Sequence, residues 1–140
     1  MAVAEKKAYF ATTLDVRLVK GDRIWELEAA LRFWSAELKC YVQAPMGYQT
    51  DFASVPRVPV AYWLYGGRAH HEGTLHDWAF CKDAINPRTG KPFTFMEAND
   101  LFLEAMTARK KPFYVRYPMY AAVCAFSYPF YHKRKVFDKL

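Results

Sequence analysis

The chain has 140 residues, of which 53% are hydrophobic, 18% aromatic and 24% charged, and this length suits one globular domain over residues 1–140. Its formal net charge is +6. The three cysteines lie far apart without a Cys-x-x-Cys pair, which excludes a zinc ribbon and makes a reducing cytoplasm the simplest compartment.

The first third of the chain alternates between apolar and polar residues and predicts three antiparallel strands. The alternating stretches are "TLDVRLV" (13–19), "IWELEAALRFW" (24–34) and "LKCYVQA" (38–44). A period of two residues is typical of a strand with one buried face. "KGDR" (20–23) predicts a hairpin turn between the first two strands. The N-terminal "MAVAEKKAYF" lacks the apolar run of a signal peptide, so we expect none.

The remainder of the chain predicts three helices. "AHHEGTLHDWAFC" (69–81) places Glu72, His76 and Phe80 on one side of a helix, together with apolar residues. "FTFMEANDLFLEAMTARK" (93–110) has apolar residues at helical spacing, and Thr94 followed by Glu97 matches a capping box. The fold class is therefore α+β, with a small antiparallel sheet of about three strands and three helices packed on one face.

The third helix is expected to begin near Pro118 and to end at Pro129. The apolar stretch at 117–131 contains both prolines and is shorter than the roughly 20 residues of a membrane span, so it predicts a core or interface helix. Its basic flanks leave binding to a membrane surface as a minor alternative.

The positive charge is concentrated in residues 109–140. This segment has eight Lys or Arg against one acidic residue, a balance of +7, whereas residues 1–108 have twelve against thirteen, a balance of −1. Tyrosines and His132 lie between the basic residues, which suits nucleic-acid contact or a protein interface. A solvated tail is the alternative. The candidate interface residues are Arg109, Lys110, Lys111, Arg116, Lys133, Arg134 and Lys135.

Three motifs give the chain a resemblance to a known family. They are "PMGYQTDFASVPR" (45–57), "LHDWAF" (75–80) and "EANDLFLEAM" (97–106). Together they resemble domain-of-unknown-function family 1353, small proteins encoded by bacteriophages and prophages, over roughly residues 24 to 125. The resemblance implies origin and fold more than activity. This chain departs from the family pattern at Tyr48, where phenylalanine is usual, and at Asn99, where the family has aspartate.

The polar residues of these motifs allow two interpretations. In the first, Asp51, His76 and Asp77 hold a divalent metal or form an acid–base pair that hydrolyses a substrate. In the second, Asp51, Ser54, Arg57, His76, Asp77 and Asn99 form a structural polar cluster that fastens the sheet to the helices. His76 is then expected to donate to Asn99 or to the loop backbone. The uncharged Asn99 favours the structural interpretation, because an amide binds transition metals poorly.

Our first functional hypothesis is therefore a phage accessory or virion-associated protein of the tail or tail-tip region. It would act by binding other virion proteins, without a cofactor, and would lie in the host cytoplasm before joining the particle. The alternative is a metal-dependent hydrolase directed at cell-wall peptides. A third hypothesis, a nucleic-acid-binding phage protein, rests on the basic C-terminal segment.

Overall fold

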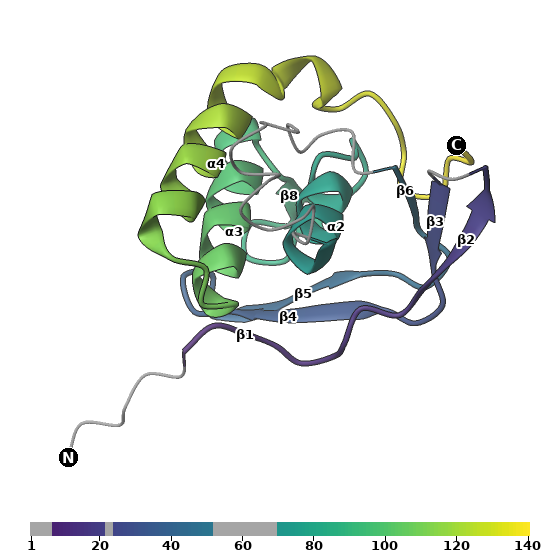
Figure 1. The fold of residues 1–140 in the computed structure, drawn as a ribbon. Helices are drawn as coiled ribbons and strands as arrows, with labels where there is room; N and C mark the ends of the chain where they lie inside the picture. The colour runs from purple at the N-terminus through teal and green to yellow at the C-terminus, as the bar shows by residue number, and fades with distance from the viewer. Residues whose placement is uncertain (1–6, 22–23, 52–69) are drawn as a thin grey trace.

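The computed structural model describes residues 7–21, 24–51 and 70–140. These residues form two three-stranded antiparallel sheets, a two-stranded ribbon and three α-helices (Figure 1). The predicted α+β class is confirmed. The strands are divided between two small sheets, whereas the sequence suggested one.

The sheet beneath the helices has the order β1-β4-β5. It contains β1 (Tyr9–Phe10), β4 (Leu31–Ser35) and β5 (Cys40–Ala44). Phe33 pairs with Val42, and both are buried with Leu31 and Ala44, whereas Arg32 is exposed. This alternation buries one face, as the period of two predicted.

The second sheet has the order β2-β3-β6 and lies toward the end of the molecule where the chain terminates (Figure 1). It contains β2 (Val16–Lys20), β3 (Ile24–Leu27) and β6 (Gln49–Thr50). The antiparallel β2–β3 pair agrees with the predicted hairpin.

The prediction of one strand over residues 24–34 was wrong. This stretch bends after Leu27, where Glu28 N donates to Asp15 O at 2.9 Å, and supplies β3 to one sheet and β4 to the other. Leu27 and Leu31 are buried on either side of the bend, whereas Ala29 between them is exposed. Because apolar residues occupy all three odd-numbered positions, the alternation in the sequence did not reveal the bend.

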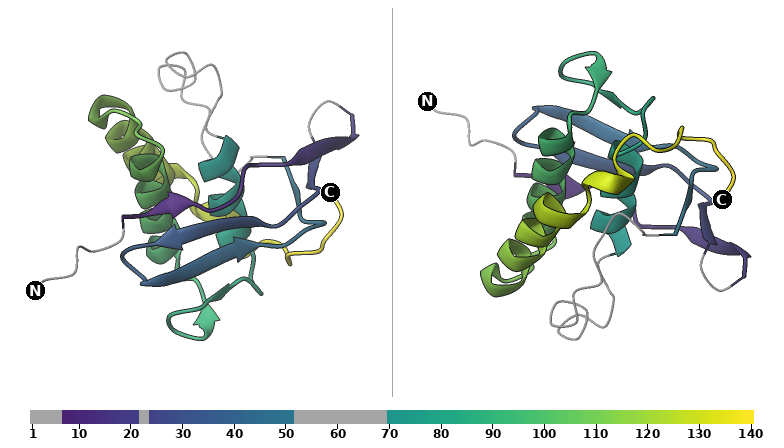
Figure 2. Two further views of the ribbon diagram at one scale, coloured as in Figure 1. Left: turned by 90° about the horizontal axis from the view of Figure 1, so that it is seen from below. Right: turned by 90° about the horizontal axis from the view of Figure 1, so that it is seen from above.

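Two helices cover one face of the β1-β4-β5 sheet, and the third packs beside them (Figures 1 and 2). The helices are α2 (His70–Ala79), α3 (Phe95–Ala108) and α4 (Phe113–Phe126), followed by the short 3-10 helix η1 (Tyr128–Phe130). The ribbon of β7 (Ile85–Asn86) and β8 (Lys91–Pro92) connects α2 to α3. α2 contacts β5, α3 contacts β4, and α4 packs on α3.

The start of α3 has the predicted capping box. Thr94 Oγ1 accepts from Glu97 N at 3.1 Å, and Thr94 N donates to Glu97 Oε1 at 2.8 Å. Two backbone N–H groups are thereby satisfied, which fixes the first turn of the helix.

The predicted start of the third helix was wrong, because α4 begins at Phe113 with Pro112 as its N-cap and runs through Pro118. Val115 and Met119 pack on α3 from either side of Pro118, and this packing offsets the backbone bond that proline removes. The helix ends at Phe126, three residues before Pro129. None of the helices formed by the described residues is both long enough and apolar enough to span a bilayer.

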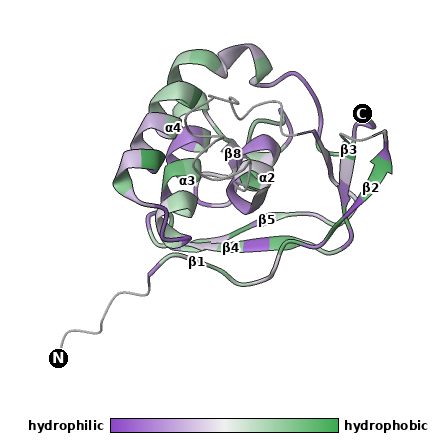
Figure 3. Ribbon diagram, viewed as in Figure 1, coloured by the Kyte–Doolittle hydropathy of each residue, from purple (hydrophilic) through white to green (hydrophobic). Residues whose placement is uncertain are grey.

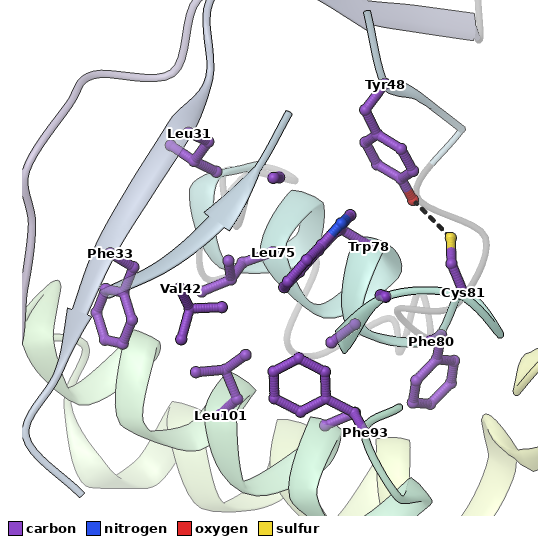
Figure 4. Close-up of a cluster of buried hydrophobic side chains, with 14 of the residues drawn as sticks. Leu31, Phe33, Val42, Tyr48, Leu75, Trp78, Phe80, Cys81, Phe93 and Leu101 are labelled. Carbon is purple, nitrogen blue, oxygen red and sulfur yellow. Dashed lines mark hydrogen bonds between the residues drawn. The ribbon is translucent and has the colours of Figure 1, made fainter. Parts of the chain in front are cut away.

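The main core lies between the β1-β4-β5 sheet and helices α2 and α3. Figure 4 shows Phe33 and Val42 from the sheet facing Leu75 of α2 and Leu101 of α3. Tyr48 belongs to the same core, and its hydroxyl lies toward Cys81. The loop that carries the family motif therefore starts from a residue fixed in the core.

Candidate functional site

The carboxylate of Asp77 connects α2 to the segment that opens the motif loop. Asp77 Oδ2 accepts hydrogen bonds from Tyr48 Oη at 2.7 Å and from Thr50 Oγ1 at 2.6 Å. All three side chains are buried, with Asp77 only 8% exposed. Two short bonds to one charged oxygen hold the beginning of the loop against the helix.

Burial raises the pKa of Asp77, while the hydrogen bonds from Thr50 and Tyr48 and the charge of Arg134 lower it. The guanidinium of Arg134 lies 4.8 Å from the centre of the Tyr48 ring and donates to Gln49 O. The negative charge of Asp77 is thus compensated from the C-terminal segment.

Cys81 lies beside Tyr48 and Asp77, and its thiol has low reactivity. Its Sγ is 3.9 Å from Tyr48 Oη and 3.7 Å from Asp77 O. Burial raises the pKa of the Cys81 thiol to about 11. Because the thiolate is the nucleophile, a thiol that stays protonated at neutral pH is unsuited to covalent catalysis.

His76 is buried between α2 and α3 and is bonded to Asn99, one of the two partners that the structural interpretation allowed. His76 Nε2 lies 2.8 Å from Asn99 Oδ1, and the imidazole contacts Phe80 and Phe102 at ring-centre distances of 4.2 and 4.9 Å. Burial lowers the pKa of His76 from 6.5 to about 4. At neutral pH the imidazole is uncharged, and its Nε2–H donates to the amide oxygen.

His76 and Asp77 bind different partners. Adjacent residues of a helix point about 100° apart, so His76 reaches Asn99 on α3, whereas Asp77 reaches Tyr48 and Thr50 at β6. Asp51 is half-buried, and its charge raises the pKa of Asp77. In the described ranges, no three His, Cys, Asp or Glu side chains stand close enough together to hold one metal ion. Ser54 and Arg57 lie outside the described residues.

The sequence patterns did not predict a buried ion pair that lies next to His76 and Asp77. Glu72 on α2 is fully buried, and its Oε1 lies 2.9 Å from Lys111 Nζ and 3.3 Å from Arg109 Nε. Glu72 occurs one helical turn before His76 on a face that is otherwise apolar. The place of Glu72 on this face could have indicated the ion pair from the sequence, because a carboxylate buried in a core requires a cation as its partner.

Lys111 and Arg134 therefore do not belong to a solvent-facing interface. Lys111 is only 5% exposed because it pairs with Glu72, and Arg134 is held against Tyr48 and Gln49. Arg116 is half-buried and donates to Lys111 O at 2.8 Å. The predicted interface residues that remain exposed are Arg109, Lys110, Lys133 and Lys135.

Comparison with known proteins gives one result. No curated protein and no solved structure shows significant similarity to the chain. The sequence profile of a family described as "Protein of unknown function (DUF1353)" matches residues 25–123, which is more than half of the chain and includes the loop and both helical motifs. The chain therefore belongs to the DUF1353 family.

Proposed function

We propose that this chain is a bacteriophage accessory protein of the virion, in the tail or tail-tip region, and that it acts by binding other virion proteins. The assignment to a phage rests on the resemblance of its motifs to those of phage and prophage proteins. The binding role rests on one observation, a set of exposed aromatic side chains on α4 and η1.

These side chains project from more than one side of α4 and from η1, and we refer to the whole set as the aromatic face. Each is between 47% and 69% exposed, although it is a large ring that burial would stabilise. Hydrophobic residues extend along much of α4 (Figure 3). The members of the aromatic face are Phe113, Tyr114, Tyr117, Phe126, Tyr128 and Phe130.

Exposed basic residues flank the aromatic face in the chain. Lys110 precedes α4, and Lys133 and Lys135 follow η1. Aromatic side chains are enriched at protein-binding surfaces, whose outer parts are polar. Nucleic-acid binding has less support, because Lys111 and Arg134 are occupied inside the protein.

The hydrolase hypothesis has no supporting observation among the described residues. His76 is buried, uncharged and bonded to Asn99, whereas Asp77 is bonded to two hydroxyl groups. Both residues hold secondary-structure elements together, and that role needs no substrate.

The test is mass spectrometry of purified particles of the phage that encodes the chain. We expect the chain to remain with the particles through density-gradient purification. A phage lacking the gene would then be complemented with Tyr117→Ser/Phe126→Ser, and we expect the amount of the chain in particles to fall.

The matched control is Leu18→Ser, which removes an exposed apolar side chain from β2, far from α4 (Figures 1 and 2). It should enter particles like the wild type. Absence of the wild-type chain from purified particles would overturn the virion role. Equal incorporation of both variants would overturn the role of the aromatic face.

A further inference from the structure

A cavity of about 90 Å³ with an acidic lining lies between α3 and the residues at β7 and before β5. Glu97, Asp100, Leu101 and Glu104 line it from one side of α3, since their spacing of three, four and seven residues places them on the same helical stripe. Glu37, Leu38 and Asn86 complete the lining. We call this site the acidic pocket.

The four carboxylates of the acidic pocket have no cationic partner among the described residues, whose ion pairs involve other acidic groups. Their hydrogen bonds go to neutral groups. Glu104 accepts from Ser35 Oγ at 2.5 Å and from Glu37 N at 3.0 Å, and Asp100 accepts from Tyr120 Oη at 2.6 Å. Burial raises the pKa of Glu37, and the charges of Glu104 and Asp100 raise it further. The acidic pocket therefore has negative charge that no cation among the described residues compensates.

Asn86 provides a second and independent sign of a ligand. Its side chain is fully buried, and its Oδ1 accepts from Arg88 N at 2.9 Å. Its Nδ2 has no hydrogen-bond partner within the described part of the chain. Buried amide donors are rarely left unsatisfied, because this costs about 1–3 kcal/mol. Asn86 is one of the residues that line the acidic pocket.

We propose that the acidic pocket binds an arginine side chain presented by a partner protein. A guanidinium is planar and offers five N–H donors, so it can bond to several separated carboxylates at once. The volume greatly exceeds the roughly 10–15 Å³ that one water needs and admits a group of several atoms. A metal ion fits poorly, because no three ligands converge within the described residues.

This site is independent of the aromatic face, and its test does not involve particles. The probe is N-acetyl-arginine amide, added to ¹⁵N-labelled protein at physiological salt and followed by NMR. We expect saturable shifts of the Asn86 side-chain amide and of the backbone amides of Glu37, Asp100 and Glu104. N-acetyl-citrulline amide, which has nearly the same shape without the charge, should produce none of these shifts.

The variant Glu37→Gln/Asp100→Asn removes two charges while leaving an acceptor for Tyr120, and it should weaken binding by about tenfold or more, which is about 1.4 kcal/mol. The control Glu28→Gln removes an exposed carboxylate outside the pocket and should bind like the wild type. The proposal is overturned if the Asn86 amide does not respond to the wild-type titration. It is also overturned if citrulline binds equally or if both variants lose the same affinity.

Discussion

His76 and Asn99 form a neutral pair in a position where the family pattern has histidine opposite aspartate. An aspartate at position 99 would favour a charged imidazole, because an opposite charge within hydrogen-bond distance raises the pKa of histidine. The amide accepts the same Nε2–H without stabilising a positive charge as strongly. In this chain the contact therefore favours an uncharged imidazole, enclosed by Phe80 and Phe102.

The depressed pKa of His76 predicts a specific loss of stability in acid. The unfolded chain protonates His76 near pH 6.5, whereas the folded protein resists protonation until about pH 4. Stability from this residue is therefore complete above pH 6.5 and declines as the pH falls toward 4, by up to about 3 kcal/mol. Urea denaturation of the wild type at a series of pH values measures the decline.

The control for this prediction is His76→Gln, which cannot titrate. Asp77, whose pKa is raised, contributes with the opposite sign, and it does so in both proteins. The difference between the two pH profiles therefore isolates His76. Parallel profiles between pH 6.5 and 4 would contradict the pKa of about 4.

Tyr48→Phe tests the bond from the motif segment to Asp77. The substitution keeps the buried ring and removes one of the two hydroxyl donors to Oδ2. Hydrogen bonds to charged groups contribute about 1.5–3 kcal/mol, so we expect the free energy of unfolding to fall by about that amount. Phenylalanine is the usual residue of the family at this position, so the measurement gives the free energy of unfolding that the Tyr48 hydroxyl adds in this chain. Tyr114→Phe, on an exposed ring, should change the stability little, and an equal loss in both variants would refute the assignment.

Sequence patterns predicted the contacts that depend on local spacing. The helical period of 3.6 residues placed His76 beside Glu72 and Phe80 on one side of its helix, and Asn99 of the next predicted helix was one of its two expected partners. The bonds from Tyr48 and Thr50 to Asp77 depend on where the sheet meets α2, which no local pattern encodes. Lys111 was assigned to a surface because it stands in a basic run, and basic runs are usually solvated.

At the scale of elements, Glu72 and Lys111 connect α2 to the turn between α3 and α4. Glu72→Gln removes the buried carboxylate that lies 2.9 Å from Lys111 Nζ, so we expect a loss of about 3–5 kcal/mol in the free energy of unfolding. Replacing both partners, in Glu72→Gln/Lys111→Met, should recover much of this loss, because the double variant removes the buried ammonium together with the buried carboxylate. A double-mutant cycle in urea measures the coupling. Additive losses would show that the two residues act separately.

The boundaries of α4 show why proline signals were ambiguous in this chain. Pro112 and Pro118 both lie near the start of an apolar stretch, and either satisfies the preference for proline at a helix N-terminus. The structure uses Pro112, because starting there places Val115 as well as Met119 against α3. The boundary is thus decided by tertiary packing, which outweighs the cost of Pro118 inside the helix.

At the scale of the whole molecule, most buried hydrophobic side chains of residues 7–21, 24–51 and 70–140 belong to two clusters of unequal size. The larger cluster includes residues from both three-stranded sheets, α2 and α3. The smaller one joins α3 to α4 through Phe102, Met106, Val115, Met119 and Val123. The sequence predicted the α+β content and the buried face of β4 and β5. It also predicted a buried face for the first alternating stretch, but Leu18 in β2 is 44% exposed. It did not predict that the strands divide into two sheets, because the pairing of distant strands such as β3 with β6 is a non-local property.

The unequal clusters predict that α4 opens before the rest of the molecule. Helices α3 and α4 each have 14 residues, but α3 buries six of them and α4 only four, and α4 also contains Pro118 and the exposed rings of the aromatic face. Local stability follows buried apolar contact, so native-state hydrogen exchange should give α4 amides a lower opening free energy than α3 amides. Because α3 has the same length, it serves as the internal reference. Equal opening free energies in the two helices would show that α4 unfolds only together with the main core. If the aromatic face binds a partner, protection should rise most in α4, since covering those rings stabilises the closed helix by mass action.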